Sequence, residues 1–229
     1  METKKVCSSE LAYVLGILFL ALGTALMEKA GFGVSMVVAP AYLLHLKISQ
    51  TIPSYTFGTS EYVFQAVLLV LLFIVLRRFR ISYLFSFITA VVFGFTLDFM
   101  IMLLGKLPSD GFELRTFYYV SGMLICAVGI SFFFHTYIAP EAYELFVKEV
   151  AAHFGKNINN VKTAYDICSC CISVILSFIF FGFGHFEGVK LGTILCALVN
   201  GQLIGIVSSV LESRFEFRDA LPYRKFFDK

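Results

Sequence analysis

The sequence predicts an all-α, polytopic membrane helix bundle with six full spans and two short interrupted or interfacial helices. Of the 229 residues, 59% are hydrophobic and only 15% are charged, and the mean hydropathy is +0.84. Soluble domains are about 45–50% apolar and about 25% charged, so this chain has more apolar surface than one soluble core could bury. The apolar residues form long, unbroken runs and do not alternate with polar ones, which indicates membrane helices and excludes barrel strands.

Six apolar runs are long enough to cross a bilayer, which requires about 20 residues. The predicted spans are Leu11–Met27, Phe57–Leu76, Ile81–Leu104, Phe117–Ile138, Ala164–Phe181 and Val189–Leu211. The first run follows two lysines, as a signal peptide would, but Ala25-Leu26-Met27 is a poor cleavage site, so we interpret it as a signal anchor. The length suits one membrane domain over residues 1–229 with no separate soluble domain.

The distribution of basic residues predicts the orientation of the chain. With the N-terminus inside, 13 of the 18 Lys and Arg residues lie in cytoplasmic segments and 5 lie outside or at the outer interface. Cytoplasmic loops of membrane proteins carry an excess of Lys and Arg. We therefore expect both termini to be cytoplasmic.

Two further segments are too short or too interrupted to be simple spans. Gly31–Leu46 contains Pro40, which is costly inside a helix, so we expect a re-entrant half-helix that turns or breaks near this proline. Ala139–His153 carries several charged residues and is expected to form an amphipathic helix at the membrane interface.

The two halves of the chain resemble each other weakly but in order. The matched residues are Gly23 with Gly129, Ala39–Tyr42 with Ala139–Tyr143, Phe57–Gln65 with Ile158–Asp166, and Gly94 with Gly201. We interpret residues 11–104 as a first repeat and residues 117–211 as a second. Each contains three spans, an odd number, so the second repeat must be inverted. Inverted repeats with Pro- or Gly-interrupted segments at matching places are typical of secondary transporters.

Several short blocks resemble the YczE/YyaS/YitT-type bacterial membrane proteins over nearly the whole chain. These blocks are Gly31–Ser35, Phe57–Thr59, Gly94 with Asp98, Gly192-Thr193 and Asn200-Gly201. The resemblance implies a bacterial inner-membrane protein of this topology, in a family whose biochemical function is largely unassigned. Such families commonly carry Pro-Trp-Asp after the first Gly-rich turn. Here Met36-Val37-Val38 follows Ser35, so any role of that Asp does not transfer.

Polar and ionisable residues within or beside the apolar runs are the candidates for a binding site, because an Asp at the centre of a membrane helix costs about 2.5–3.5 kcal/mol. The candidate substrate-binding residues are Gly33, Pro40, Glu61, Gln65, Asp98, Asp166, Asn200 and Gln202. Asp98 is either a cation or proton site or an interfacial acid that reaches water. Glu61 and Asp166 are either site residues or carboxylates at helix starts, where the helix dipole favours them. Asn200 and Gln202 either bind substrate or tie helices together.

Two features of the later spans have structural interpretations. Gly201 and Gly205 form a GxxxG motif, which predicts that this face of the last span packs inward. His135, near the inner end of the fourth span, is either a structural histidine or a proton relay, and we favour the structural reading.

The sequence contains no motif that calls for an enzyme, and we predict no catalytic residues, no metal and no cofactor. The six cysteines are mostly expected to be small buried hydrophobes. Cys168, Cys170 and Cys171 form C-x-C-C without a second ligand pair, which is weak evidence for zinc. The net charge of +2, with no basic patch among aromatics, argues against a nucleic-acid partner.

These observations favour a small-molecule or ion transporter with its site between the two repeats. The alternatives are a non-transporting membrane scaffold or regulatory factor, and a substrate-binding subunit of an energy-coupled importer. The expected partners are the lipid bilayer and an unknown small molecule or ion, and the sequence leaves a homodimer open. A transporter needs polar residues such as Gln65, Asp98 and Asn200 to converge on one cavity, whereas a scaffold can leave them dispersed.

Overall fold

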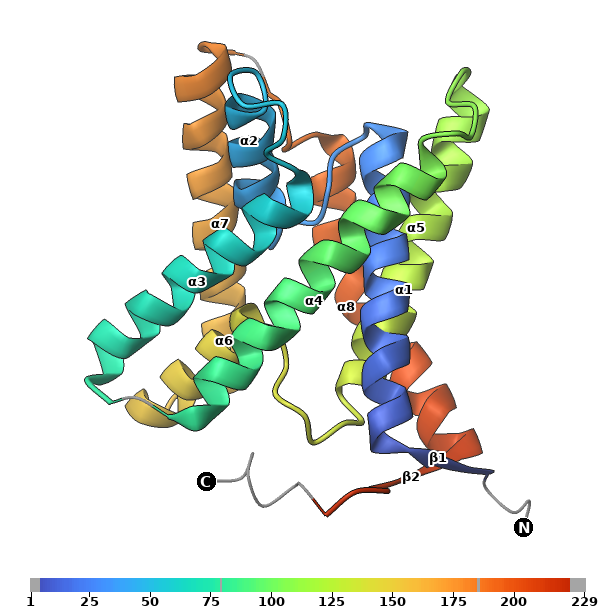
Figure 1. The fold of residues 1–229 in the computed structure, drawn as a ribbon, viewed down its shortest axis with the longest axis vertical. Helices are drawn as coiled ribbons and strands as arrows, with labels where there is room; N and C mark the ends of the chain where they lie inside the picture. Colours follow the sequence, from blue (N-terminus) through green and yellow to red (C-terminus); the bar gives the residue numbers. More distant parts are fainter. Residues whose placement is uncertain (1–4, 79, 185, 223–229) are drawn as a thin grey trace.

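The structure is a computed structural model that describes residues 5–78, 80–184 and 186–222. Within them the chain forms eight helices and two short strands (Figure 1). In order these are β1 Lys5–Ser8, α1 Ser9–Ala30, α2 Ala39–Ile48, α3 Phe57–Leu76, α4 Ile81–Leu104, α5 Phe112–Phe133, α6 Ala142–Phe154, α7 Ile158–Phe181, α8 Leu191–Arg214 and β2 Phe215–Arg218. Six helices, α1, α3, α4, α5, α7 and α8, are long and apolar enough to cross a membrane, which confirms the predicted fold class.

The bounds of the spans differ most from the prediction at α5 and α7. α5 begins at Phe112, directly after Gly111 with its positive φ of 94°, and it ends at Phe133 before the predicted Ile138. α7 begins at Ile158, ahead of the predicted Ala164. Polar residues such as Glu113 and Lys162 lower the local hydropathy at these starts, but the backbone hydrogen bonding of a helix continues through them.

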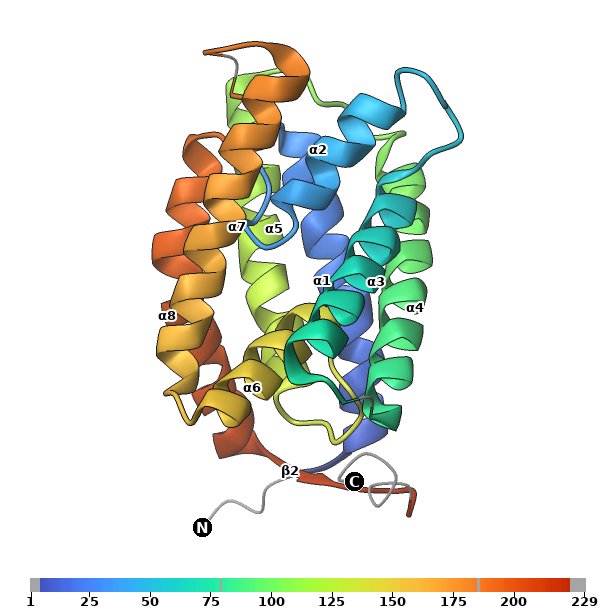
Figure 2. The same cartoon turned by 90° about the vertical axis from the view of Figure 1, so that its left-hand side faces the viewer.

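The predicted interruption between residues 31 and 46 is confirmed, although it precedes Pro40. α1 ends at Ala30, Gly31 adopts a left-handed conformation (φ 67°), and α2 begins only at Ala39. Pro40 lies in the first turn of α2, where a helix does not need its missing N–H. In Figure 2 the connector after α1 dips into the bundle, and α2 runs back toward the end at which α1 finished.

The predicted amphipathic segment does form a helix, α6, but its acidic residues are not simply solvated. Glu141 and Glu149 are buried. Glu149 forms a 2.8 Å ion pair with Arg80, which lies in the turn between α3 and α4. α6 packs against α3, α4 and α7, so these tertiary contacts enclose a face that an isolated interfacial helix would expose.

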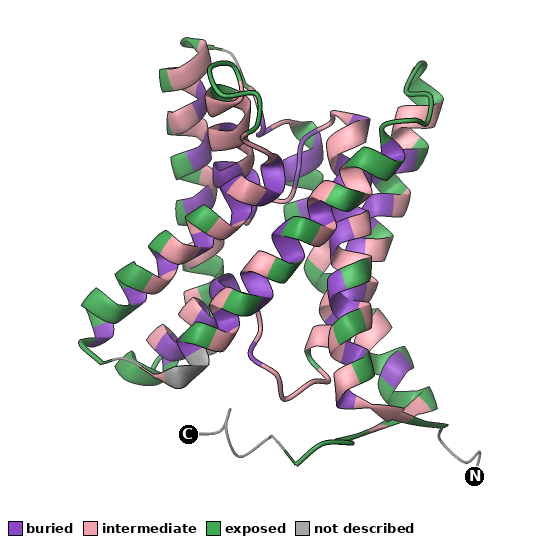
Figure 3. Ribbon diagram, in the orientation of Figure 1, coloured by how far each residue is buried: buried purple, intermediate pink, exposed green. Residues whose placement is uncertain are grey.

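The centre of the bundle is the contact between α1 and α5, flanked by α4 on α1 and by α8 on α5 (Figure 1). Glycines allow the two central backbones to approach closely. A Cβ placed on Gly23 would lie 2.6 Å from the carbonyl oxygen of Gly122, and Gly16 faces Gly129 in the same way. Figure 3 shows the buried residues concentrated along these inner faces and the exposed ones on the outer faces.

The two strands place the beginning and end of the described chain at the same end of the bundle. β1 and β2 pair in parallel, with Lys5 opposite Phe215. The sequence did not indicate these strands, which are only four residues long. Figure 1 shows that the turn between α3 and α4 and the connection between α6 and α7 lie at this same end.

The expectation for the GxxxG face of α8 is wrong. A Cβ on Gly201 or Gly205 would have no atom within 4 Å among the described residues. α8 contacts α5 through another face, on which Gly192 and Cys196 are buried. The motif therefore points away from the bundle.

Candidate functional site

The strongest polar cluster begins with two fully buried side chains on α3. Glu61 and Gln65 are one helical turn apart, so they share a face, and both are 0% exposed. This face is turned toward the start of α6. The hydroxyl of Tyr143 donates a 2.7 Å hydrogen bond to Oε2 of Glu61.

Gln65 joins α3 to the N-terminus of α6. Its Oε1 accepts a 3.0 Å hydrogen bond from the backbone N–H of Ala142, one of the donors that a helix start leaves without an intrahelical partner. Its Nε2 donates to Oε2 of Glu141 at 3.5 Å. Gln65 thus contacts Glu141, and Glu61 on the same face of α3 contacts Tyr143, so both α3 side chains meet the start of α6 in the other half of the chain.

Each of these two carboxyls has an oxygen without a partner. Oε1 of Glu61 and Oε1 of Glu141 are buried and have no hydrogen-bond partner among the residues that the structure describes. Leaving such an atom buried and unpaired costs about 1–3 kcal/mol, and more if the group is charged. Burial, followed by the charges of Glu144 and Glu61, raises the pKa of Glu141 well above its ordinary value. The pair is suited to holding a proton.

The backbone that carries Glu141 is held by hydroxyls of α4. Oγ1 of Thr89 donates to the carbonyl of Ala139 at 3.0 Å, and Oγ of Ser86 donates to the carbonyl of Pro140 at 2.6 Å. Non-helical backbone at membrane depth is tolerated only where protein satisfies it. α3 and α4 of the first half thus fix the start of α6 in the second half.

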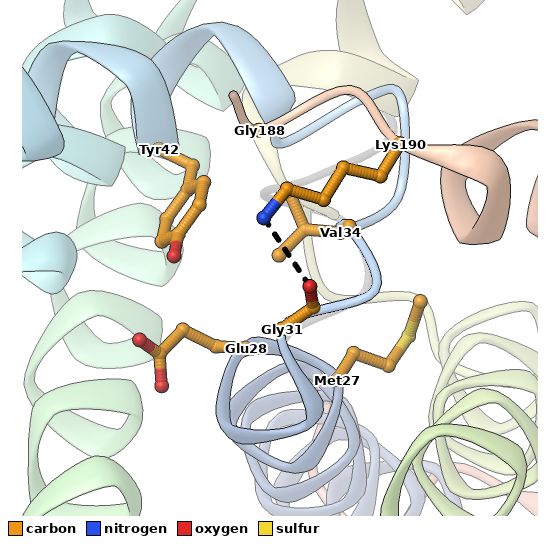
Figure 4. A pocket seen from close by; sticks show the side chains of 8 residues that line it. Met27, Glu28, Gly31, Val34, Tyr42, Gly188 and Lys190 are labelled. Carbon is orange, nitrogen blue, oxygen red and sulfur yellow. Dashed lines mark hydrogen bonds between the residues drawn. The ribbon is translucent and has the colours of Figure 1, made fainter. Parts of the chain in front are cut away.

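A second polar cluster lies at the opposite end of the bundle, where α1 ends (Figure 4). Lys190 donates to the carbonyl of Gly31 at 3.3 Å, and Arg115 donates to the carbonyl of Ala30 at 2.7 Å. Tyr42 and Glu28 point toward each other across a hollow whose free space is about 10 Å³. That space suits at most about one water, so this cluster closes the end of α1 and does not offer a substrate cavity.

The structure brings together Glu61 and Gln65 of the predicted residues and places Asp98 elsewhere. Oδ1 of Asp98 accepts a 2.8 Å hydrogen bond from the backbone N–H of Gly58, and Oδ2 accepts one of 2.5 Å from Thr56. Asp98 on α4 therefore caps the N-terminus of α3. The sequence did not predict this capping role.

The other predicted residues make no hydrogen bond to Glu61 or Gln65 among the described residues. Gly33 adopts φ 105° beside Thr193 in the connector before α2, and Pro40 is buried in the first turn of α2. Asp166 on α7 and Asn200 on α8 each have a buried oxygen without a hydrogen-bond partner in the described chain. Gln202 is exposed.

The structural reading of His135 agrees with its contacts. Its Nδ1 lies 2.7 Å from the carbonyl of Ser131, its Nε2 lies 3.3 Å from Glu212, and its ring packs on Phe217. The burial of the cysteines varies more than expected, since Cys126 and Cys196 are buried but Cys168 and Cys171 are exposed.

Sequence reasoning missed Glu141 and Tyr143. Both lie in the segment that was interpreted as interfacial, where charged residues are expected to face water. One signal was available: relative to Ala39–Tyr42, the matching stretch Ala139–Tyr143 contains one extra residue, and that residue is Glu141.

Comparison with known proteins yields one match. A family model described as a family of unknown function (DUF6198) matches residues 7–209. No curated protein and no solved structure is similar enough to the chain to be matched with it. The family match brings no known substrate or activity, and the resemblance to the YczE/YyaS/YitT-type proteins stays an expectation.

Proposed function

The chain belongs to this family of unknown function (DUF6198), and we propose that it is a membrane transporter of a small molecule or ion whose cycle includes proton binding at Glu61 and Glu141. One observation carries the proposal. Two buried carboxyls, one from each half of the chain, meet at the contact between α3 and the start of α6, and each retains an oxygen without a partner among the described residues. Transporters bind coupling ions at such junctions between halves.

The order of the elements supports an inverted repeat. The chain runs long helix, half-helix, long helix, long helix from α1 to α4, and again from α5 to α8. α2 runs toward one end of the bundle and α6 toward the other (Figure 2). If α1 to α4 are matched in order with α5 to α8, the contact between α2 and α7 becomes the contact between α6 and α3, and both are present. In the same way, the contact between α1 and α4 matches the contact between α5 and α8. We propose an axis in the membrane plane that passes through the α1–α5 contact.

The chemistry of the pair gives a reason for proton coupling. Two buried carboxylates repel each other, so a proton on one of them stabilises the contact between α3 and α6, and its loss destabilises that contact. Protonation would then favour one arrangement of the two halves over another, which is the requirement for a ligand to drive a conformational change.

The charge bias supports an orientation for this transporter. The end that bears β1, β2 and the α3–α4 turn carries most of the basic residues that the structure describes, and the positive-inside rule assigns that end to the cytoplasm. We therefore propose a bacterial inner-membrane location with both termini cytoplasmic.

The proton itself is the probe for the test. The protein is reconstituted in liposomes, and infrared difference spectra are recorded between about pH 5 and about pH 9 to follow the protonation of Glu61 and Glu141. We expect a protonated-carboxyl band that is lost in Glu61→Gln and Glu141→Gln but kept in Glu113→Gln, an exposed glutamate. Dissipation of an imposed pH gradient by candidate substrates is then measured in the same liposomes. The absence of that band, or normal transport by both variants, would contradict the proposal.

A second candidate function is favoured by a different observation. α8 leaves most of its side chains exposed, and its GxxxG face has no partner in the described chain. A scaffold, a regulatory factor or an importer subunit would use such a face to bind another membrane protein. Cross-linking from Gly201→Cys in native membranes, together with an absence of transport in liposomes, would favour this alternative.

A further inference from the structure

An apolar groove separates the ends of α3 and α4 that lie nearest their connecting turn. The two helices cross closely at Gly58 and Gly94, where a Cβ on Gly94 would lie 2.6 Å from the carbonyl oxygen of Gly58. From there they diverge (Figure 1). The groove has a volume of about 590 Å³ and is lined by Ala66, Leu69, Val70 and Phe73 of α3 and by Leu84 and Phe87 of α4.

Three arginines stand in the turn at the wide end of this groove. Arg80 is neutralised by its 2.8 Å ion pair with Glu149. Arg78 is exposed and touches His153 at 3.4 Å, and Arg77 is exposed with no ion pair or side-chain hydrogen bond in the described part of the chain. Arg77 follows Phe73 by one turn, since its N–H donates to the carbonyl of Phe73 at 2.8 Å. Two exposed arginines therefore follow directly after the end of α3 that lines the groove.

We propose that this groove binds an anionic phospholipid, with an acyl chain between α3 and α4 and the phosphate at Arg77 and Arg78. Arginine forms paired hydrogen bonds with phosphate oxygens, and basic pockets between membrane helices bind anionic head groups. The groove offers the apolar length and the charge at one end that such a lipid requires. The inference is independent of the transport function and does not require Glu61 or Glu141.

Charge complementarity favours a lipid over a second copy of the chain. In a dimer with its axis along the membrane normal, the arginine turns of the two copies would meet at the same depth. Their like charges would repel each other across the contact. An anionic lipid neutralises the same arginines.

The test measures lipid binding to the purified full chain by native mass spectrometry, with phosphatidylglycerol and phosphatidylcholine as probes. The charge variant is Arg77→Gln with Arg78→Gln, and its matched control is Lys148→Gln with Lys156→Gln, which removes two exposed charges on and beside α6. The groove variant is Val70→Trp, and its matched control is Val67→Trp, an exposed valine on α3 outside the groove.

We expect the wild type to prefer phosphatidylglycerol, and we expect the arginine variant to weaken that binding by roughly ten- to thirtyfold while the lysine control retains it. Val70→Trp should reduce binding of both lipids, and Val67→Trp should not. Equal losses in the arginine and lysine variants would overturn the proposal by revealing general surface attraction. It is also overturned if Val70→Trp breaks a dimer without changing the bound lipid. If Val70→Trp does not fold, the comparison of the arginine variant with its lysine control still tests the proposal.

Discussion

At the scale of single residues, the carboxyl of Glu141 is buried and its charged form has no cationic partner in the described chain. Burial and the charges of Glu144 and Glu61 raise its pKa above the ordinary 4.5. The folded state therefore holds its proton to a higher pH than the unfolded state does. Its contribution to stability is complete below the ordinary pKa and declines as pH rises toward the raised pKa.

Glu141→Gln should remove this pH dependence, because the amide is neutral at every pH and keeps the shape of the acid. We expect the melting temperature of the wild type in detergent to fall as the pH rises above the ordinary pKa of 4.5, and that of Glu141→Gln to change much less. Glu113→Gln, an exposed control, should keep the slope of the wild type. An unchanged slope in Glu141→Gln would show that another group is responsible.

At the scale of helices, Asp98 acts on the start of α3 from its neighbour α4. It accepts hydrogen bonds from the N–H of Gly58 and the hydroxyl of Thr56, and its charge lies at the positive end of the α3 dipole. Asp98→Ala should therefore lower the free energy of unfolding by about 1–2 kcal/mol. The comparison is Asp110→Ala, an exposed acid in the following loop, which should cost less than about 0.5 kcal/mol. Similar losses in both variants, measured by denaturant titration, would contradict the capping role.

The close contact between α1 and α5 leads to a second prediction at this scale, which concerns stability. A methyl group at Gly23 would meet the backbone of Gly122 at 2.6 Å, so Gly23→Ala should destabilise the protein by about 1–3 kcal/mol. Gly201→Ala adds the same methyl where no described atom lies within 4 Å, and it should be neutral or stabilising by up to about 1 kcal/mol. Thermal unfolding of the two variants provides the comparison. A loss at Gly201 as large as that at Gly23 would mean that α8 has a partner in the purified protein.

At the scale of the whole molecule, the six spans were predictable because membrane helices must be long and apolar, and hydropathy measures both properties directly. Their polar ends were not, because α5 and α7 extend beyond the apolar residues. The candidate site was predictable only on α3, where Glu61 and Gln65 interrupt an apolar run. Glu141 was missed because its burial depends on α3 and α4, which are distant in sequence. The capping role of Asp98 was not predicted for the same reason, since its partners lie about forty residues earlier.

The topology of the whole chain depends on α6 not crossing the membrane. Its 13 residues extend only about 20 Å, whereas the apolar core of a bilayer is about 30 Å thick. The positions before α4 and after α6 must then lie on the same side. In a cysteine-free background, Arg77→Cys and Lys156→Cys should both resist an impermeant thiol reagent in intact cells, whereas Lys106→Cys between α4 and α5 should react. Opposite labelling of Arg77→Cys and Lys156→Cys would mean that α6 crosses, and it would remove the matching pair of half-helices on which the inverted repeat depends.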